Sequence, residues 1–188
     1  MLKPLSFAFV LAALPAATLA DDIKAALDAA LAAHSAGDLS STAAQLTNAT
    51  RAVHTAQRAR LTAKLPEAPA GWTRSVQDQG EAGALLVNMT GVTTEARYAK
   101  ADGSGFTLTL AADSPLATQM MGMFASQQML AMMGKTKSVA GQDMLVQDNS
   151  LTTMAGGRVL VQAQGMDPDA MAEILGLIDY AALPRYDR

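Results

Sequence analysis

A stretch of 21 residues without a charged side chain, residues 114–134, interrupts a series of short strand patterns in the second half of the chain. It reads SPLATQMMGMFASQQMLAMMG and holds six of the chain's twelve methionines. Its length approaches that of a membrane span. A span would separate strands that should share one sheet, and the stretch contains Gln119, Gln127 and Gln128. We therefore predict a helix within the folded domain and no transmembrane segment in the mature chain.

Residues typical of helix ends mark both ends of this stretch. Ser114 can cap a helix, Pro115 suits its first position, and Gly134 suits its end. Lys135 and Lys137 follow, where positive charge is favourable near a helix C-terminus. Because the segment is apolar nearly all round, we expect it to be covered on more than one side.

The strand patterns predict an antiparallel sheet. Phe106, Leu108 and Leu110 alternate with threonines, as in a strand with one buried face. Short turns separate the strand segments, which favours antiparallel pairing with helices on one face of the sheet. The predicted strands are residues 84–90, 93–100, 106–110, 135–141, 143–148, 150–155 and 158–164.

A C-terminal helix is predicted after the last strand. Asp167 can cap it and Pro168 suits its first position. Its apolar stripe consists of Met171, Ile174, Leu175 and Ile178.

The first part of the chain predicts a helical hairpin. Ile23, Leu27 and Leu31 recur at helical spacing, and Asp21 or Asp22 can cap that helix. A short break at residues 36–38 precedes a second helix that Ser40 or Ser41 can cap. Since the connection is short, the two helices should pack antiparallel.

The chain begins with the features of a secretory signal peptide. A positive residue, Lys3, precedes an apolar run, and small residues precede Asp21. We expect cleavage before Asp21 and a periplasmic or secreted protein, as in Gram-negative export. The predicted organisation is a signal peptide (1–20), a helical hairpin (21–64), a linker (65–72) and an antiparallel α+β domain (73–188).

Composition excludes several functional classes. The chain has no cysteine, so it has neither disulfides nor thiolate chemistry. Its formal net charge of −3, with scattered charges, lacks the basic surface typical of nucleic-acid binding. No HExxH, GxSxG, P-loop or GxGxxG pattern occurs, and the two histidines, His34 and His54, are too far apart along the hairpin to share a metal. We expect no enzymatic activity and no cofactor.

The methionine-rich segment is the most specific candidate site. Methionine fills irregular cores, but its flexible side chain also suits surfaces that bind apolar ligands or partners. Trp72, the only tryptophan, is interpreted either as an anchor for the linker or as a ligand platform. The candidate residues for binding an apolar ligand or a partner protein are Met120, Met121, Met123, Phe124, Met129, Met132, Met133 and Trp72.

Copper binding is the alternative interpretation. Thioether sulfur is a soft ligand for Cu(I), and Met129, Met132 and Met133 have the spacing that brings side chains together on one helix face. Copper-handling segments usually also contain His, Asp or Glu, and this one contains none.

The motifs AGD, LPEAPAGW and GGRVLVQAQG resemble small, uncharacterised exported bacterial proteins. The hairpin sequence is similar to one helix pair of a tetratricopeptide repeat, present in a single copy. By element order, residues 72–183 resemble the PsbP-like and lipoprotein-carrier folds. That resemblance implies a non-enzymatic binding or interaction module, because proteins of those folds mostly hold partner proteins or lipids.

Overall fold

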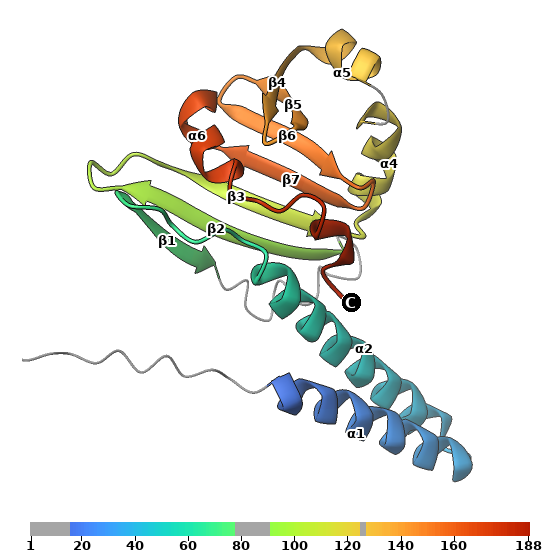
Figure 1. The fold of residues 1–188 in the computed structure, drawn as a ribbon. Helices are drawn as coiled ribbons and strands as arrows, with labels where there is room; N and C mark the ends of the chain where they lie inside the picture. The colour runs from blue at the N-terminus through green and yellow to red at the C-terminus, as the bar shows by residue number, and fades with distance from the viewer. Residues whose placement is uncertain (1–15, 78–90, 125–126) are drawn as a thin grey trace, which may run out of the picture. The chain divides into compact units, whose positions relative to one another are not determined.

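The computed structural model describes residues 16–77, 91–124 and 127–188 and divides into two compact units, residues 1–52 and 53–188 (Figure 1). The boundary lies within a helix, whereas the sequence placed the end of the hairpin at the linker of residues 65–72. The last turns of that helix therefore belong to the sheet-containing unit.

The first unit contains the predicted pair of helices, α1 (Ala16–Ser35) and the start of α2 (Leu39–Thr62). Gly37, with a φ of +77°, ends α1: its N–H donates to the His34 carbonyl oxygen, and the Asp38 N–H donates to that of Ala33. Asp38 caps α2 by accepting hydrogen bonds from the backbone N–H and the hydroxyl of Ser41, at 2.9 and 2.6 Å. These bonds lower the pKa of Asp38.

Both cap predictions for the hairpin were wrong. Asp21 and Asp22 lie inside α1, which begins at Ala16. Ser40 and Ser41 lie inside α2, because the carboxylate of Asp38 is better placed to accept the free N–H groups of the first turn.

The second unit contains a seven-stranded antiparallel sheet, which confirms the predicted α+β class. Its spatial order is β1-β2-β3-β7-β6-β5-β4, so two meanders meet where β3 pairs with β7. The strands are β1 (Trp72–Gln77), β2 (Val92–Lys100), β3 (Gly105–Ala112), β4 (Lys135–Val139), β5 (Gln142–Gln147), β6 (Ser150–Ala155) and β7 (Val159–Gln164).

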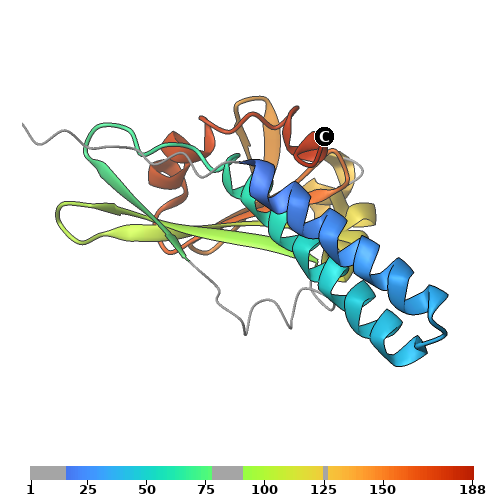
Figure 2. The same ribbon diagram turned by 90° about the horizontal axis from the view of Figure 1, so that it is seen from below.

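Helices cover both faces of the sheet, although the sequence predicted helices on one face only. One face packs against helix α6 (Pro168–Leu175) and the 3-10 turn η1 (Leu183–Arg185), as Figure 2 shows, and we call it the first face. Two helices between β3 and β4, α4 (Pro115–Phe124) and α5 (Gln127–Met133), are associated with the second face. There Phe124 packs on Met154 and Leu160, which alternate with first-face residues along β6 and β7.

The first face carries the larger core. Strand β3 alternates as predicted, and Phe106, Leu108 and Leu110 are all buried. The predicted stripe of α6 is also buried, and Asp167 caps that helix by accepting from the Asp169 N–H at 2.8 Å.

An aromatic cluster closes one end of this core. Tyr98 stacks on its cross-strand neighbour Phe106 with ring centroids 5.4 Å apart, and Trp72 meets Phe106 edge-on at 5.8 Å. The Tyr98 hydroxyl donates to the Pro66 carbonyl oxygen at 2.6 Å, and Arg74 donates to the carbonyls of Leu65 and Pro66. Burial raises the pKa of Tyr98 to about 12. These contacts hold the segment before β1 against the sheet.

The strand predictions were largely confirmed, with two differences. The predicted strand at residues 84–90 lies outside the described residues. Strand β1 was missed because WTRSVQ has only one buried residue, Trp72, and its pairing with β2 stabilises it as an edge strand.

A contact between Gly156 and Pro184 holds η1 on the β6–β7 turn. Gly156 has a φ of +54°, and a Cβ there would lie 2.3 Å from Cγ of Pro184. We expect Gly156→Ala to lower the free energy of unfolding by about 3 kcal/mol, from left-handed strain plus the clash. Gly141→Ala is the matched control, because Gly141 also has a positive φ but no atom within 4 Å of its Cβ position. If the two variants had equal free energies of unfolding in urea, the close contact between Gly156 and Pro184 would not contribute to stability.

Candidate functional site

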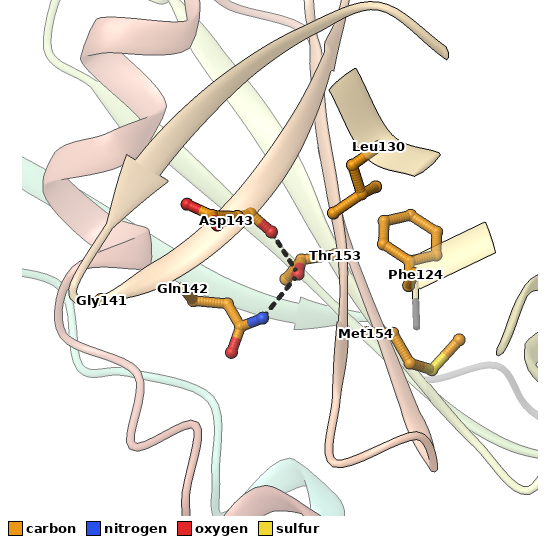
Figure 3. Close-up of a pocket in the computed structure, with 7 residues that line it drawn as sticks. All are labelled: Phe124, Leu130, Gly141, Gln142, Asp143, Thr153 and Met154. Atoms are coloured by element: carbon orange, nitrogen blue, oxygen red, sulfur yellow. Dashed lines mark hydrogen bonds between the residues drawn. The ribbon is translucent and has the colours of Figure 1, made fainter. Parts of the chain in front are cut away.

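A cavity of about 170 Å³ lies between the methionine-rich helices and strands β5 and β6 of the sheet. Figure 3 shows its lining: Phe124 at the end of α4, Leu130 on α5, and residues of β5, β6 and the β4–β5 turn. Its apolar wall is formed by Phe124, Leu130 and Met154, and its polar wall by Gln142, Asp143 and Thr153, with Gly141 between them. The site is therefore amphipathic.

Local sequence explains the polar wall. Ala140 and Gly141 both have positive φ angles, 51° and 76°, and they form the two-residue connection of the β4–β5 hairpin. This tight turn brings Gln142 and Asp143 to the start of β5, opposite the end of β6.

Hydrogen bonds fix the polar wall in place. The Thr153 hydroxyl donates to the Asp143 carbonyl oxygen at 2.8 Å and accepts from Nε2 of Gln142 at 3.1 Å (Figure 3). Because Thr153 is fully buried, these bonds satisfy a group that would otherwise be costly to bury. The polar wall is preorganised by residues of the sheet rather than by a mobile loop.

The predicted site residues divide into three groups. Phe124 lines the cavity, and α5 carries Met129 and Met132 on its surface, 48% and 83% exposed. Trp72 is buried in the aromatic cluster of the other core, as expected of an anchor. The side chains of Met120, Met121, Met123 and Met133 lie outside what the structure describes, although their backbones belong to α4 and α5.

The expectation that the methionine-rich segment would be covered on more than one side is wrong for α5. Leu130 is only 4% exposed, whereas Met129 and Met132 are open to solvent. The segment forms two short helices, so α5 can anchor itself through Leu130. Only one side of a seven-residue helix is needed for that anchor, and the opposite side stays uncovered.

Sequence reasoning missed the sheet side of the cavity. Met154 follows the alternation of β6, and its position opposite Asp143 could have been inferred had the β5–β6 register been known. The segments DMLVQD and SLTTMA predicted two strands but not which of their residues face the inserted helices. The sequence did not indicate that Leu130 would be buried, because most of its neighbours are apolar as well.

A second, more open hollow of about 590 Å³ lies between the β4–β5 turn and the C-terminal segment. Its polar groups are already engaged. Asp179 accepts from the N–H groups of Ala181 and Ala182, and the Tyr180 hydroxyl donates to the Leu175 carbonyl oxygen at 3.0 Å. Burial raises the pKa of Tyr180. This hollow offers less recognition chemistry than the smaller cavity.

Among the residues that the structure describes, the densest charged cluster is centred on Arg158, before β7. Its guanidinium donates to both carboxylate oxygens of Asp113, at 2.7 and 2.8 Å, and of Asp187, at 2.9 and 2.7 Å. It also donates to the Pro184 carbonyl oxygen and lies 5.1 Å from the ring centroid of Tyr186. Hydrogen bonds from Arg158 lower the pKa of Asp187, and the two carboxylates raise that of Arg158.

This cluster has a structural role. Tyr186 donates to Asp113 at 3.2 Å, and burial raises its pKa, so its hydroxyl stays protonated. Arg158 satisfies both carboxylates at once, which leaves neither available as a base. The cluster fastens the C-terminal residues to the end of β3.

No other arrangement points to catalysis in the described part of the chain. Within residues 16–77, 91–124 and 127–188, no three His, Asp or Glu side chains are placed to hold a metal ion together. His34 is exposed on α1 and His54 is half-buried on α2. Among the same residues, no helix is both long and apolar enough to cross a membrane.

Comparisons of the chain with protein-family models, with curated proteins and with solved structures found no match. The geometry of the chain itself therefore carries the functional argument.

The Arg158 cluster predicts an acid-sensitive contribution to stability. Asp187 has a lowered pKa in the folded protein, so its contribution is complete above its unfolded pKa, near 4, and disappears as the pH falls through the lowered value. We expect Asp187→Asn to reduce the free energy of unfolding by about 1–2 kcal/mol at pH 7. The difference from wild type should shrink below about pH 4.

The matched control is Asp148→Asn, at an exposed turn position with a φ of 47° that asparagine adopts readily. Urea unfolding of the three proteins between pH 3 and pH 7 measures both effects. A constant difference between wild type and Asp187→Asn over that range would contradict the assignment.

Proposed function

We propose that this protein is a non-enzymatic, exported interaction module that docks a partner protein on its methionine-rich helices. An apolar or aromatic side chain of the partner enters the cavity lined by Phe124, Leu130 and Met154, and Met129 and Met132 contact the surrounding surface. The proposal rests on one observation: two exposed methionines lie on the helix that also supplies Leu130 to an amphipathic cavity.

The size of the cavity favours a side chain over a lipid. Pockets for drug-sized ligands occupy about 300–1,000 Å³. A cavity of about 170 Å³ resembles in size the one of about 150 Å³ that binds benzene in an engineered protein. An acyl chain would not fit, whereas one ring or one branched aliphatic group would.

The chemistry of the walls narrows the occupant further. One side of the cavity is apolar, and the other is lined by the polar residues Gln142, Asp143 and Thr153. A phenol ring matches both walls, because its ring is apolar and its hydroxyl can donate or accept. The exposed methionines around the opening can adapt to a partner's surface, since the thioether side chain is flexible and polarisable.

The test uses p-cresol and toluene, the side-chain analogues of tyrosine and phenylalanine, in a titration followed by NMR of ¹³C-methyl-labelled methionine. We expect the Met154 methyl resonance to shift with a Kd of about 1 mM, because a ligand with few atoms has little binding free energy available. The methyl groups of Met144 and Met171, buried in the other core, should not shift and serve as internal controls.

Variants distinguish cavity binding from surface contact. Leu130→Gln places an amide in the apolar wall and should weaken toluene binding about tenfold. Thr136→Gln, at an exposed position on β4, should leave it unchanged. Saturable binding of palmitate at Met154, or no response to either ring, would contradict the proposal.

A second candidate function, Cu(I) binding, is supported by the exposure of Met129 and Met132, one helical turn apart on α5. Met129→Leu/Met132→Leu/Met133→Leu removes the sulfur atoms and retains apolar surface. If the protein binds copper, anaerobic Cu(I) titration should show a site that this variant loses. If the methionines serve docking alone, no stoichiometric site should appear in either protein.

A further inference from the structure

The helical hairpin of residues 16–52 has two different sides. The most buried positions of its inner seam are small residues: Ala30 on α1 and Ala49 on α2 are each only 5% exposed. The less exposed positions recur every three or four residues along both helices: 23, 26, 29–30 and 33 on α1, and 42, 45, 49 and 52 on α2. That is the spacing of a coiled-coil seam.

The large apolar side chains lie outside this seam. Leu27 and Leu31 on α1 are 49% and 66% exposed, and Leu39 and Leu46 on α2 are 71% and 49% exposed. At 3.6 residues per turn, the leucines of each helix lie about a quarter turn from its seam. The seam therefore leaves the hairpin's most apolar residues in solvent.

The four leucines share one side of the hairpin. In both helices they lie about a quarter turn from the seam in the same rotational sense. The two helices run in opposite directions, so the same rotation away from the seam points to the same side of the hairpin in both. Both pairs of leucines therefore lie on one side. We call this side, with Leu27, Leu31, Leu39 and Leu46, the leucine face.

The leucine face carries few polar residues. On α2, Ala43 lies between Leu39 and Leu46, and Thr50 lies one turn beyond Leu46. Lys24 is the charged residue at its edge, and it is paired with Asp28 at 2.5 Å. The opposite side presents small and polar side chains: Asp22, Ala25, Ala32, Ser41, Ala44, Asn48 and Arg51.

The leucine face is complementary to itself. Because α1 ends at Ser35 and α2 begins at Leu39, counting back from the turn places Leu46 at about the level of the midpoint between Leu27 and Leu31. On a second copy, with its loop at the same end, Leu46 would enter the gap between Leu27 and Leu31, as a knob enters a hole. The two-fold axis then creates the same contact twice.

We propose that the leucine face binds the leucine face of a second copy of this chain, forming a four-helix bundle with both loops at one end. Each face is about 25 Å long and two helices wide, so the dimer buries on the order of 1,000 Å² in total. This area is near the lower limit for specific interfaces, so we expect a micromolar dissociation constant.

The test is sedimentation equilibrium of the purified full chain, as it accumulates in cells, from about 1 µM to about 500 µM. We expect a monomer–dimer equilibrium that Leu31→Glu and Leu46→Glu each weaken at least tenfold. Ala32→Glu and Ala44→Glu place the same charge on the opposite side and should leave the equilibrium unchanged. Circular dichroism melting checks that all four variants stay folded.

Cysteine cross-linking tests the orientation, since the natural chain has no cysteine. Lys24→Cys and Thr50→Cys proteins, mixed and oxidised, should form a disulfide-linked heterodimer, because positions 24 and 50 lie at the same level of the bundle. A single-cysteine Ala44→Cys protein should cross-link far less. A chain that is monomeric at the highest concentration, or equal weakening by the glutamates on both sides, would overturn the dimer. Homodimers without heterodimers would overturn the orientation.

Discussion

The pairing of β3 with β7 is the constraint on which the sheet-containing unit depends. Six residue pairs, from Thr107–Gln164 to Ala112–Val159, join strands separated by almost fifty residues of chain. This pairing unites two meanders, each built from local hairpins, into one sheet with a continuous first face. It also requires the intervening chain to cross from one meander to the other. The methionine-rich helices are that crossing, which explains why they are associated with the sheet.

The two faces of the sheet are finished differently. The first is sealed by α6 and the C-terminal segment, which the Arg158 cluster fastens to the end of β3. The second holds a small apolar cluster of Met154 and Leu160 together with Ala111 and Phe124. A sealed core supplies stability, whereas a partly covered face with a cavity can accept an external group. The proposed docking site therefore lies on the face that contributes less to the core.

Local patterns predicted much of this fold because its elements follow local rules. The alternation of β3, the turn residues of the hairpins and the stripe of α6 all appear in the sequence at the observed positions. The errors arose where a neighbour in space or in the backbone decided the outcome. Strand β1 depends on its pairing with β2, and the cap of α2 is Asp38, in the turn between the two helices. Strand propensity alone does not predict β1.

The sequence by itself determined the fold class, the helical nature of the methionine-rich segment and the absence of cysteine chemistry, because periodicity and composition act locally. The tertiary structure decided which apolar residues become core and which become surface. Trp72 is buried because Phe106 and Tyr98 surround it, Met132 is exposed because Leu130 anchors α5, and the leucines of the hairpin are exposed because alanines form its seam. All of these are apolar residues in helices or strands, so their different exposure depends on their neighbours. Neighbours that are distant along the chain are decided by tertiary packing.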